Sequence, residues 1–348
     1  MSNILERVEP VLNCYPNYGH IFSIVGRKTE DFLPWVYDHF VQVYAPNQYE
    51  RGIRADFATP DMIRSFPWIE TDHVNRQIIN NKWDNIIEFI KDYVDRGYYI
   101  YALFDVSQIS LYHANRAWYH DPLIYGYDDE DEVLYFADNY RSGKYSIGRA
   151  SYKEILNATE KYEGNTEVID WLKGVFCIRY KKIYDFGNYR LFDSYKYTFD
   201  EKLYTDLLED FLYERNSFLR WSAPQNLVEV DDNVWGIGVN AFLREYLIYV
   251  KDNNCELDQR SFYVLLEHSK LIQKGMEYIK REKHYDFLQN ELELAKENLD
   301  LCIMMCNLCV KFNVLKRQDI LIKIRNKLLL LKEKQEELFV KLIKAFKL

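Results

Sequence analysis

Residues 13–20, Asn-Cys-Tyr-Pro-Asn-Tyr-Gly-His, set the pattern for the first part of the chain. They place Cys14 in the first turn of a predicted helix, where Pro16 fits because the first helical N–H groups have no partners within the helix. Apolar residues follow at a spacing that predicts one buried helical face: Ile21, Phe22, Ile24 and Val25. A helix N-terminus carries positive partial charge, which lowers the pKa of a thiol. Cys14 is therefore a candidate nucleophile; the alternative is a small buried residue.

The composition narrows the class of protein. The chain has 348 residues, 48% of them hydrophobic and 28% charged, with a formal net charge of −9. This length allows a sizeable core in one large or two modest domains, and the negative charge argues against a general nucleic-acid binder. Charged residues open the chain, and no run approaches the roughly 20 apolar residues that a membrane span requires. We expect a cytoplasmic protein that binds neither nucleic acid nor membrane.

The cysteines predict neither a disulfide framework nor a cluster. The six cysteines have no regular spacing, and a reducing compartment would keep Cys14 free. Cys302, Cys306 and Cys309 match a spacing that holds iron–sulfur clusters in other proteins. In a helix these positions share one face, so a packed stripe is the simpler interpretation. We expect no metal and no cofactor.

Hydrophobic periodicity divides the chain near residue 197. Before it, the patterns predict helices at 83–94 and 151–162 and strands at 40–44, 98–104, 120–127, 132–137, 175–180 and 183–192. After it, they predict helices at 199–214, 235–252, 258–281, 284–312 and 316–346. We predict an α+β fold: domain 1–197, a first helix with an antiparallel sheet, and an all-helical domain 198–348.

The end of the chain is basic. From residue 310 onward there are 11 Lys and Arg against 4 Asp and Glu, in a chain whose total charge is −9. A basic helix on an acidic protein would attract an acidic partner. The alternative is an ordinary solvated helix face.

Two residues of the predicted 120–137 hairpin complete a candidate catalytic constellation with Cys14. A thiol nucleophile needs a base, and the base needs a group that holds its tautomer and orientation. His120 opens one strand of the hairpin and Asp138 closes the next, so both side chains can reach the same rim of the sheet. Asn139 is an alternative orienting group.

Several nearby residues leave other interpretations open. His113 is the second candidate for the base. His20, six residues after Cys14, either lowers the thiol pKa or has a capping or surface role. Residues 128–131, Asp-Asp-Glu-Asp, fit a hairpin turn better than a Ca²⁺ loop, because ligands do not alternate toward a bidentate Glu.

The motifs around these residues resemble papain-like cysteine enzymes. They are Cys14 at a helix start, residues 120–129 (His-Asp-Pro-Leu-Ile-Tyr-Gly-Tyr-Asp-Asp) and residues 136–139 (Phe-Ala-Asp-Asn). The resemblance is greatest to the bacterial branch related to double-glycine leader peptidases. Residues 101–105, 235–237 and 265–270 also resemble the butirosin-type acyltransferases, which join a papain-like domain to a helical domain, and the amide-forming cysteine protease homologues of the closthioamide type. The resemblance spans most of the chain.

The resemblance implies roles for particular residues. Cys14 is the nucleophile, His120 the general base and then acid, and Asp138 the orienting group. The glutamine that papain-like enzymes place upstream of the cysteine has no counterpart, so the backbone N–H of Cys14 with Asn13 or Asn17 is the candidate oxyanion site. The aromatic residues expected to line a tunnel that excludes water are Trp68, Trp83, Tyr112, Trp118 and Tyr119.

The resemblance also implies a reaction. The acyl or peptidyl group would arrive as a phosphopantetheine thioester on a carrier protein, which would dock on the basic C-terminal helix. It would move to Cys14 and then to a small amine, giving an amide in nonribosomal metabolite biosynthesis. A peptidase or amidase with the same triad, and an inactive papain-like scaffold that binds a partner, are the alternatives.

Overall fold

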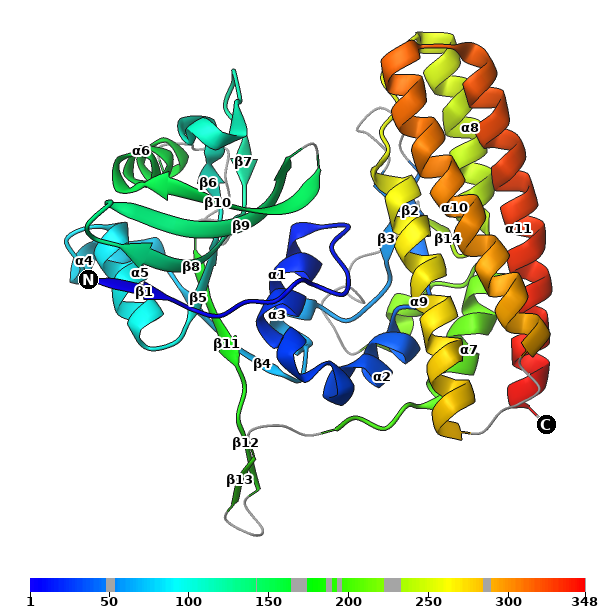
Figure 1. Ribbon diagram of the computed structural model, residues 1–348, viewed down its shortest axis with the longest axis horizontal. Coiled ribbons are helices and arrows are strands. Elements are labelled where there is room, and N and C mark those ends of the chain that lie inside the picture. The colour runs from blue at the N-terminus through cyan, green and yellow to red at the C-terminus, as the bar shows by residue number, and fades with distance from the viewer. Residues whose placement is uncertain are drawn as a thin grey trace. The chain divides into compact units, whose positions relative to one another are not determined.

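The computed structural model describes residues 1–47, 54–141, 143–163, 174–185, 190–192, 196–221, 233–283 and 289–347. The chain forms two compact units. Unit 1 comprises Met1–Thr29 and Asp61–Tyr195, and unit 2 comprises Glu30–Pro60 and Lys196–Leu348. Both α-helices and antiparallel strands occur, and the C-terminal part of the chain is helical (Figure 1).

Unit 1 is built on an antiparallel sheet. Its strands are β1 (Ser2–Ile4), β4 (Ile69–Val74), β5 (Tyr99–Ala102), β8 (Leu123–Asp128), β9 (Val133–Arg141), β10 (Lys144–Ser151) and β11 (Val175–Tyr180). They lie in the order β10-β9-β8-β5-β11-β4, and β1 pairs with β8. A Cβ at Gly126 would lie 2.8 Å from the Asn3 carbonyl oxygen, so glycine permits the close approach of β1.

Smaller elements complete unit 1. They are helices α1 (Pro16–Val25), α3 (Met62–Ser65), α4 (Arg76–Lys82), α5 (Ile86–Asp95) and α6 (Tyr152–Glu163), 3-10 turns η1 (Gly26–Lys28), η2 (Val106–Gln108) and η3 (Ser110–Tyr112), and strands β6 (Phe104–Asp105), β7 (Tyr119–His120), β12 (Ile183–Asp185) and β13 (Arg190–Phe192). Strand β6 pairs with β7, and β12 pairs with β13.

Alternation along the strands gives the sheet two covered faces. Ile100 and Ala102 join a buried cluster that includes Phe89 and Ile90 of α5. Tyr101, between them, lies against His20 of α1, with ring centroids 5.3 Å apart. Helix α1 also packs against β9 and β11, whereas α5 packs against β5, β8 and α6. The period of two in β5 thus places the helix that follows Cys14 on one face and α5 on the other.

Unit 2 joins a helical array to a small sheet. Its elements are α2 (Thr29–His39), β2 (Val43–Pro46), β3 (Asp56–Phe57), α7 (Glu201–Leu212), η4 (Ser217–Arg220), β14 (Asn233–Trp235), α8 (Gly238–Asn253), α9 (Arg260–Lys283), α10 (Gln289–Leu315) and α11 (Gln318–Phe346). Helix α10 packs against α9 and α11, and α11 also packs against α7 and α8. The five helices predicted after residue 198 correspond to α7–α11; residues 284–288 lie outside the described residues.

The predicted division into 1–197 and 198–348 needs one correction. The second boundary falls close to the prediction, but Glu30–Pro60 belongs to unit 2. Residues 30–60 belong to unit 2 because they pair with distant partners there, and β2 lies between β14 and β3 in one sheet. The His268 Nε2–H donates to the Val41 carbonyl at 2.8 Å, and the Ala55 N–H donates to Ser261 Oγ at 2.9 Å.

Two expectations about the C-terminal helices can be compared with the fold. Among the described residues, α10 is one helix that is long and apolar enough to cross a membrane, and 33% of its most apolar stretch is buried. Length and composition alone give this result, so the expectation that the protein does not bind a membrane stays a prediction. In α11, Lys323 pairs with Asp319 at 3.2 Å and Lys341 with Glu337 at 2.6 Å, so part of its positive charge is balanced within the helix.

Candidate active site

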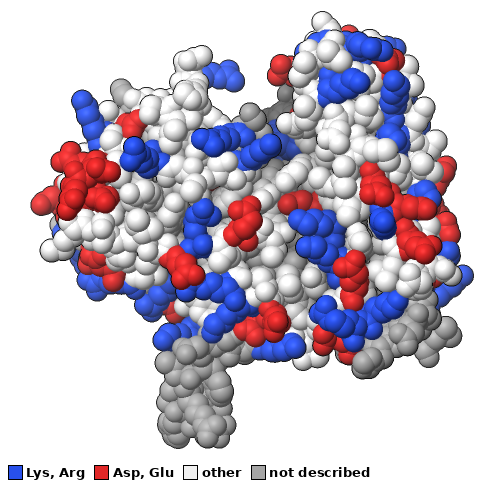
Figure 2. Space-filling view, viewed as in Figure 1, with Lys and Arg blue, Asp and Glu red and all other residues white. Residues whose placement is uncertain are grey.

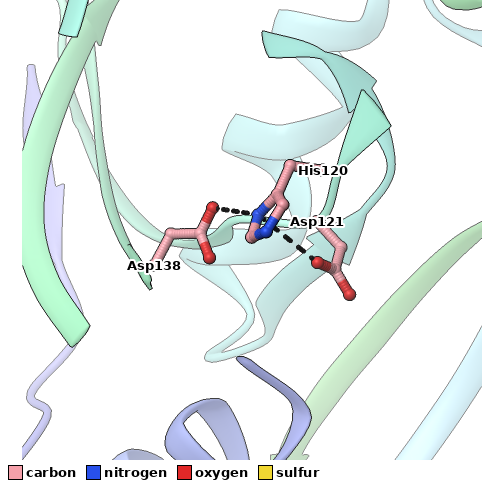
Figure 3. A group of neighbouring side chains, drawn as sticks. All are labelled: His120, Asp121 and Asp138. Atoms are coloured by element: carbon pink, nitrogen blue, oxygen red, sulfur yellow. Dashed lines mark hydrogen bonds and ion pairs between the residues drawn. The ribbon is translucent and has the colours of Figure 1, made fainter. Parts of the chain in front are cut away.

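An imidazole–carboxylate pair lies at the rim of the sheet in unit 1. His120 Nδ1 is 2.5 Å from Asp138 Oδ2 (Figure 3). The strand register explains the meeting, because Leu123 of β8 lies opposite Ala137 of β9. Asp138 does not close its strand as predicted. Strand β9 continues to Arg141, because β10 pairs with it beyond that point.

Asp138 is held by three donors. Besides the imidazole, the Tyr112 hydroxyl donates to Oδ2 and the Asn139 N–H donates to Oδ1 at 2.6 Å. The Asp138 carboxylate is fully buried. The burial of Tyr112 itself, and then the negative charge of Asp138, raise the pKa of the Tyr112 hydroxyl. Tyr112 therefore stays a protonated donor. Because Asp138 accepts from Nδ1–H, the neutral imidazole of His120 keeps Nε2 as its basic nitrogen.

Asp121 places a second carboxylate beside the imidazole. Its Oδ1 is 3.6 Å from His120 Nδ1 (Figure 3). Its Oδ2 accepts a hydrogen bond from the Tyr101 hydroxyl. Burial, and then repulsion by Asp138, raises the pKa of Asp121 to about 6, against the opposing effects of His120 and Tyr101. This carboxyl group thus changes charge near neutrality, next to the candidate base.

Cys14 lies just before α1 rather than inside its first turn. The helix begins at Pro16, with Tyr15 as an extended N-cap residue. The exposed fraction of Cys14 is 9%. The Asn139 Nδ2–H donates to the Asn13 carbonyl at 3.0 Å, which ties the residue before Cys14 to the residue after Asp138. This hydrogen bond holds the chain at Cys14 against the end of β9 that carries Asp138.

His20 makes a second tie between α1 and the histidine strand. Its Nε2–H donates to the Asp121 carbonyl at 2.8 Å, and its Nδ1 accepts from the Tyr145 hydroxyl at 3.0 Å. Burial lowers the pKa of His20 to about 4. The capping or surface alternative is wrong, because the side chain is 1% exposed. His20 is a neutral buried residue that positions α1 beside the connection between β7 and β8.

Two of the predicted aromatic residues lie at the imidazole. The ring of Trp118 meets that of His120 edge-on at 5.1 Å and is 38% exposed. The Tyr112 ring lies 6.2 Å from the same imidazole. Residues 114–118 line an open hollow of about 750 Å³. Trp118 thus contacts the imidazole and also lines this hollow.

The other three predicted tunnel residues lie elsewhere in unit 1. Trp68 is fully buried against Phe66, 5.1 Å between ring centroids. Trp83 packs at the edge of the core cluster on the α5 face of the sheet. Tyr119 points to the other side of β7 from His120, toward Tyr162. The full burial of Trp68 rules out a tunnel role for that residue, since large aromatic residues serve a core as readily as a cleft. The tunnel roles of Trp83 and Tyr119 stay predictions.

The remaining predicted residues have simpler positions. Asn13 contributes its carbonyl to the tie with Asn139, and Asn17 lies in the first turn of α1. Their role as oxyanion donors stays a prediction. Asp138, and not Asn139, orients the imidazole, because His120 Nδ1 lies at Asp138 Oδ2, while the Asn139 amide donates to the Asn13 and Gly143 carbonyls. His113 is exposed at the end of η3, and Asp138 bonds to His120 instead.

The same side chains form a group that could hold a metal ion. One ligand atom from each of His120, Asp121 and Asp138 lies within 4.8 Å of the others. An imidazole with two carboxylates suits a divalent cation such as Zn²⁺. The hydrogen bonds from Tyr112 and His120 already occupy Asp138 Oδ2, which favours the carboxylate–imidazole arrangement.

Sequence analysis did not single out Asp121, Tyr101 or Tyr145. Asp121 directly follows His120 and precedes Pro122, so its nearness to the imidazole could have been inferred from the chain alone. Tyr101 of β5 opens the motif at 101–105, but no pattern pointed to its hydroxyl as a partner of Asp121. Tyr145 comes from β10, and among the 30 tyrosines of the chain nothing in the sequence marks it.

Comparison with known proteins does not assign this site. No protein-family model matches the chain, and no curated protein matches it. A function for the site therefore rests on the geometry of unit 1.

Proposed function

We propose that the protein is a papain-like cysteine acyltransferase. Cys14 receives an acyl or peptidyl group from a carrier-protein thioester and passes it to an amine. The observation that carries the proposal is the oriented His120–Asp138 pair, joined through Asn139 to the residue preceding Cys14. A thiol before a helix, an imidazole whose Nδ1–H is held by a carboxylate and the buried carboxylate itself form the set of groups that cysteine nucleophiles use.

The first half-reaction loads the enzyme. Cys14 transfers its proton to His120 Nε2, and the thiolate attacks the thioester carbonyl. A bond forms between Sγ and the acyl carbon, and the bond to the carrier thiol breaks. The departing thiolate takes the proton from the imidazolium, which Asp138 stabilises through Nδ1–H. Exchange of one thioester for another is nearly balanced, so this step needs no ATP.

The second half-reaction forms the amide. A neutral amine attacks the acyl carbon and gives a proton to His120 Nε2. The C–N bond forms, the C–S bond breaks, and the proton returns to the Cys14 sulfur. Water would compete with the amine, so an apolar environment around the acyl-enzyme matters. Trp118, exposed beside His120, supplies one apolar wall for the acyl chain.

Intact-mass spectrometry tests the proposal. The full-length protein is incubated with an acylated carrier protein, first alone and then with an amine. We expect an acyl adduct that is absent from Cys14→Ala and that an amine converts into an amide. Cys177→Ala is the matched control, because burial raises the pKa of that thiol and the adduct should persist.

The outcomes separate the alternatives. Release of free acid without amide would indicate a hydrolase with the same residues. A stable complex with the carrier and no adduct would indicate a binding scaffold. Loss of activity in EDTA, restored by Zn²⁺, would assign His120, Asp121 and Asp138 to a metal site and contradict the proposal.

A further inference from the structure

A second cavity in unit 1 has a basic lining. It has a volume of about 510 Å³, and five cationic side chains line it: Arg27, Lys28, Arg96, Arg179 and Lys182. Two carboxylates, Glu6 and Glu70, share the lining. The lining therefore carries a net charge of +3, in a chain whose total charge is −9. Such a local reversal of sign raises the concentration of anions at the cavity.

The cavity is remote from the candidate active site. Ile24 and Val25, at the C-terminal end of α1, line it, whereas Cys14 precedes the N-terminal end of the same helix. Ten helical residues separate the two by about 15 Å at 1.5 Å per residue. In Figure 2, Lys and Arg side chains lie around the ends of β4 and β11, while acidic side chains gather over the turn between β8 and β9.

The cations of the lining are positioned by contacts within unit 1. Arg27 pairs with Glu6, and Arg179 pairs with Glu70. The Arg179 guanidinium also lies 4.4 Å from the centroid of the Tyr98 ring. Both ion pairs are substantially exposed, and exposed ion pairs contribute little to stability. An incoming anion can therefore share or replace the carboxylate partners at little cost.

We propose that this cavity binds a small organic anion with at least two negative charges, borne by phosphate or carboxylate groups. Guanidinium groups recognise both through paired hydrogen bonds. The volume lies in the range of about 300–1,000 Å³ typical of small-molecule sites. Ile24, Val25 and the Tyr99 ring supply apolar surface for an organic portion. This site is separate from the acyl-transfer chemistry and does not depend on it.

Calorimetric titration tests the site with two probes, inorganic pyrophosphate and citrate, on the full-length protein at low salt. We expect saturable binding of at least one, and the preferred probe identifies phosphate or carboxylate as the recognised group. Lys28→Gln with Lys182→Gln should weaken that binding by about tenfold or more, because two cations of the lining are removed. Arg96→Gln, at an exposed turn, is a second variant less prone to disturb folding.

The matched control removes the same charge elsewhere in unit 1. Arg149→Gln with Lys153→Gln changes two exposed cations outside the cavity lining and should leave the affinity within about threefold. Equal weakening in both double variants would reduce the effect to net charge and overturn the site. The site would also be overturned if neither pyrophosphate nor citrate bound at about 10 mM, a concentration that detects even weak affinity.

Discussion

Each unit contains a histidine paired with an aspartate at the same distance. In unit 1, His120 Nδ1 lies 2.5 Å from Asp138 Oδ2. In unit 2, His39 Nδ1 lies 2.5 Å from Asp38 Oδ1. The separation of the two atoms does not distinguish the pairs, so their surroundings must.

The unit 2 pair is enclosed by aromatic rings. The His39 ring stacks on Trp35 at 3.9 Å and on Trp221 at 5.3 Å. Its Nδ1 also lies 3.0 Å from the Trp35 carbonyl, and Asp38 Oδ2 accepts the Asp200 N–H at 2.7 Å. Burial raises the pKa of Asp38. These contacts join α2 to the start of α7, which is a structural role.

The unit 1 pair leaves one edge of its imidazole accessible. The side chain of His120 is 19% exposed against 10% for His39, and its Trp neighbour meets it edge-on. Asn139 ties the pair to the residue before Cys14. Of the two pairs, the one in unit 1 is thus joined to the residue that precedes a candidate nucleophile. A short imidazole–carboxylate hydrogen bond therefore shows only that a histidine is held in position. The surrounding residues determine whether that histidine can act as a base.

Substitution of the two histidines should give the largest difference between the units, measured as the rate of acyl-enzyme formation. We expect His120→Ala to slow acyl-enzyme formation by about 10³-fold, because the general base is lost. His39→Gln should leave the rate within about twofold, since no step uses that imidazole. Single-turnover mass spectrometry measures both rates. Equal losses in the two variants would remove the distinction between the pairs.

Substitution of the aspartates should likewise slow acylation only in unit 1. Asp138→Asn should lower the rate of acylation by about 10²-fold or more, because the amide no longer fixes the Nδ1–H tautomer or stabilises the imidazolium. Asp38→Asn serves as the matched control and should not change the rate. An unchanged rate in Asp138→Asn would show that the carboxylate does not orient the base.

The unit 2 pair should matter for the stability of the fold and not for the rate of acylation. Asp38→Ala removes the acceptor of His39 and of the Asp200 N–H, so we expect the free energy of unfolding to fall by about 2–4 kcal/mol. Asp252→Ala, at an exposed position of α8, should change it by less than about 0.5 kcal/mol. Urea denaturation measures both. A loss no greater than that of the control would contradict the structural role of the unit 2 pair.

The second carboxylate of unit 1 gives a smaller, pH-dependent effect. The pKa of Asp121 is raised to about 6 in the folded protein, so the folded state binds more protons than the unfolded state between about pH 4 and 6. This group therefore stabilises the fold less as the pH rises through that window. Asp121→Asn should increase stability at pH 8 by about 1–2 kcal/mol relative to its effect at pH 4. Thermal denaturation at the two pH values tests this; no difference would contradict the raised pKa.

Local sequence predicted the hairpin beside the unit 1 pair but misplaced His120. The predicted strands at 120–127 and 132–137 correspond to β8 and β9, and a hairpin needs only neighbouring residues to define it. His120 does not open β8 as predicted, because it lies on β7, which pairs with the distant strand β6. Strand β10 was not predicted, because Lys144–Ser151 has no continuous apolar pattern. Its pairing with β9 is what carries that strand past Asp138.

Contacts between distant parts of the chain could not be predicted. The placement of Glu30–Pro60 in unit 2 depends on pairing of β2 with β14, about 190 residues later. The burial of Trp68 likewise depends on packing that no local pattern specifies. The predicted strand at 40–44 begins only at Val43, where pairing with β3 starts.

The pH dependence of Cys14 alkylation tests the central claim most directly. Iodoacetamide labelling of the full-length protein, followed by peptide mass spectrometry, gives the rate at each of the six free cysteines. Cys306 and Cys302 serve as internal references, because burial raises their pKa to about 12. We predict that Cys14 reacts fastest, with a half-maximal rate below about pH 7, and that His120→Ala moves this midpoint toward the ordinary thiol value of about 8.5. A midpoint near 8.5 in the unaltered protein, unchanged by His120→Ala, would contradict a functional pairing of Cys14 with His120.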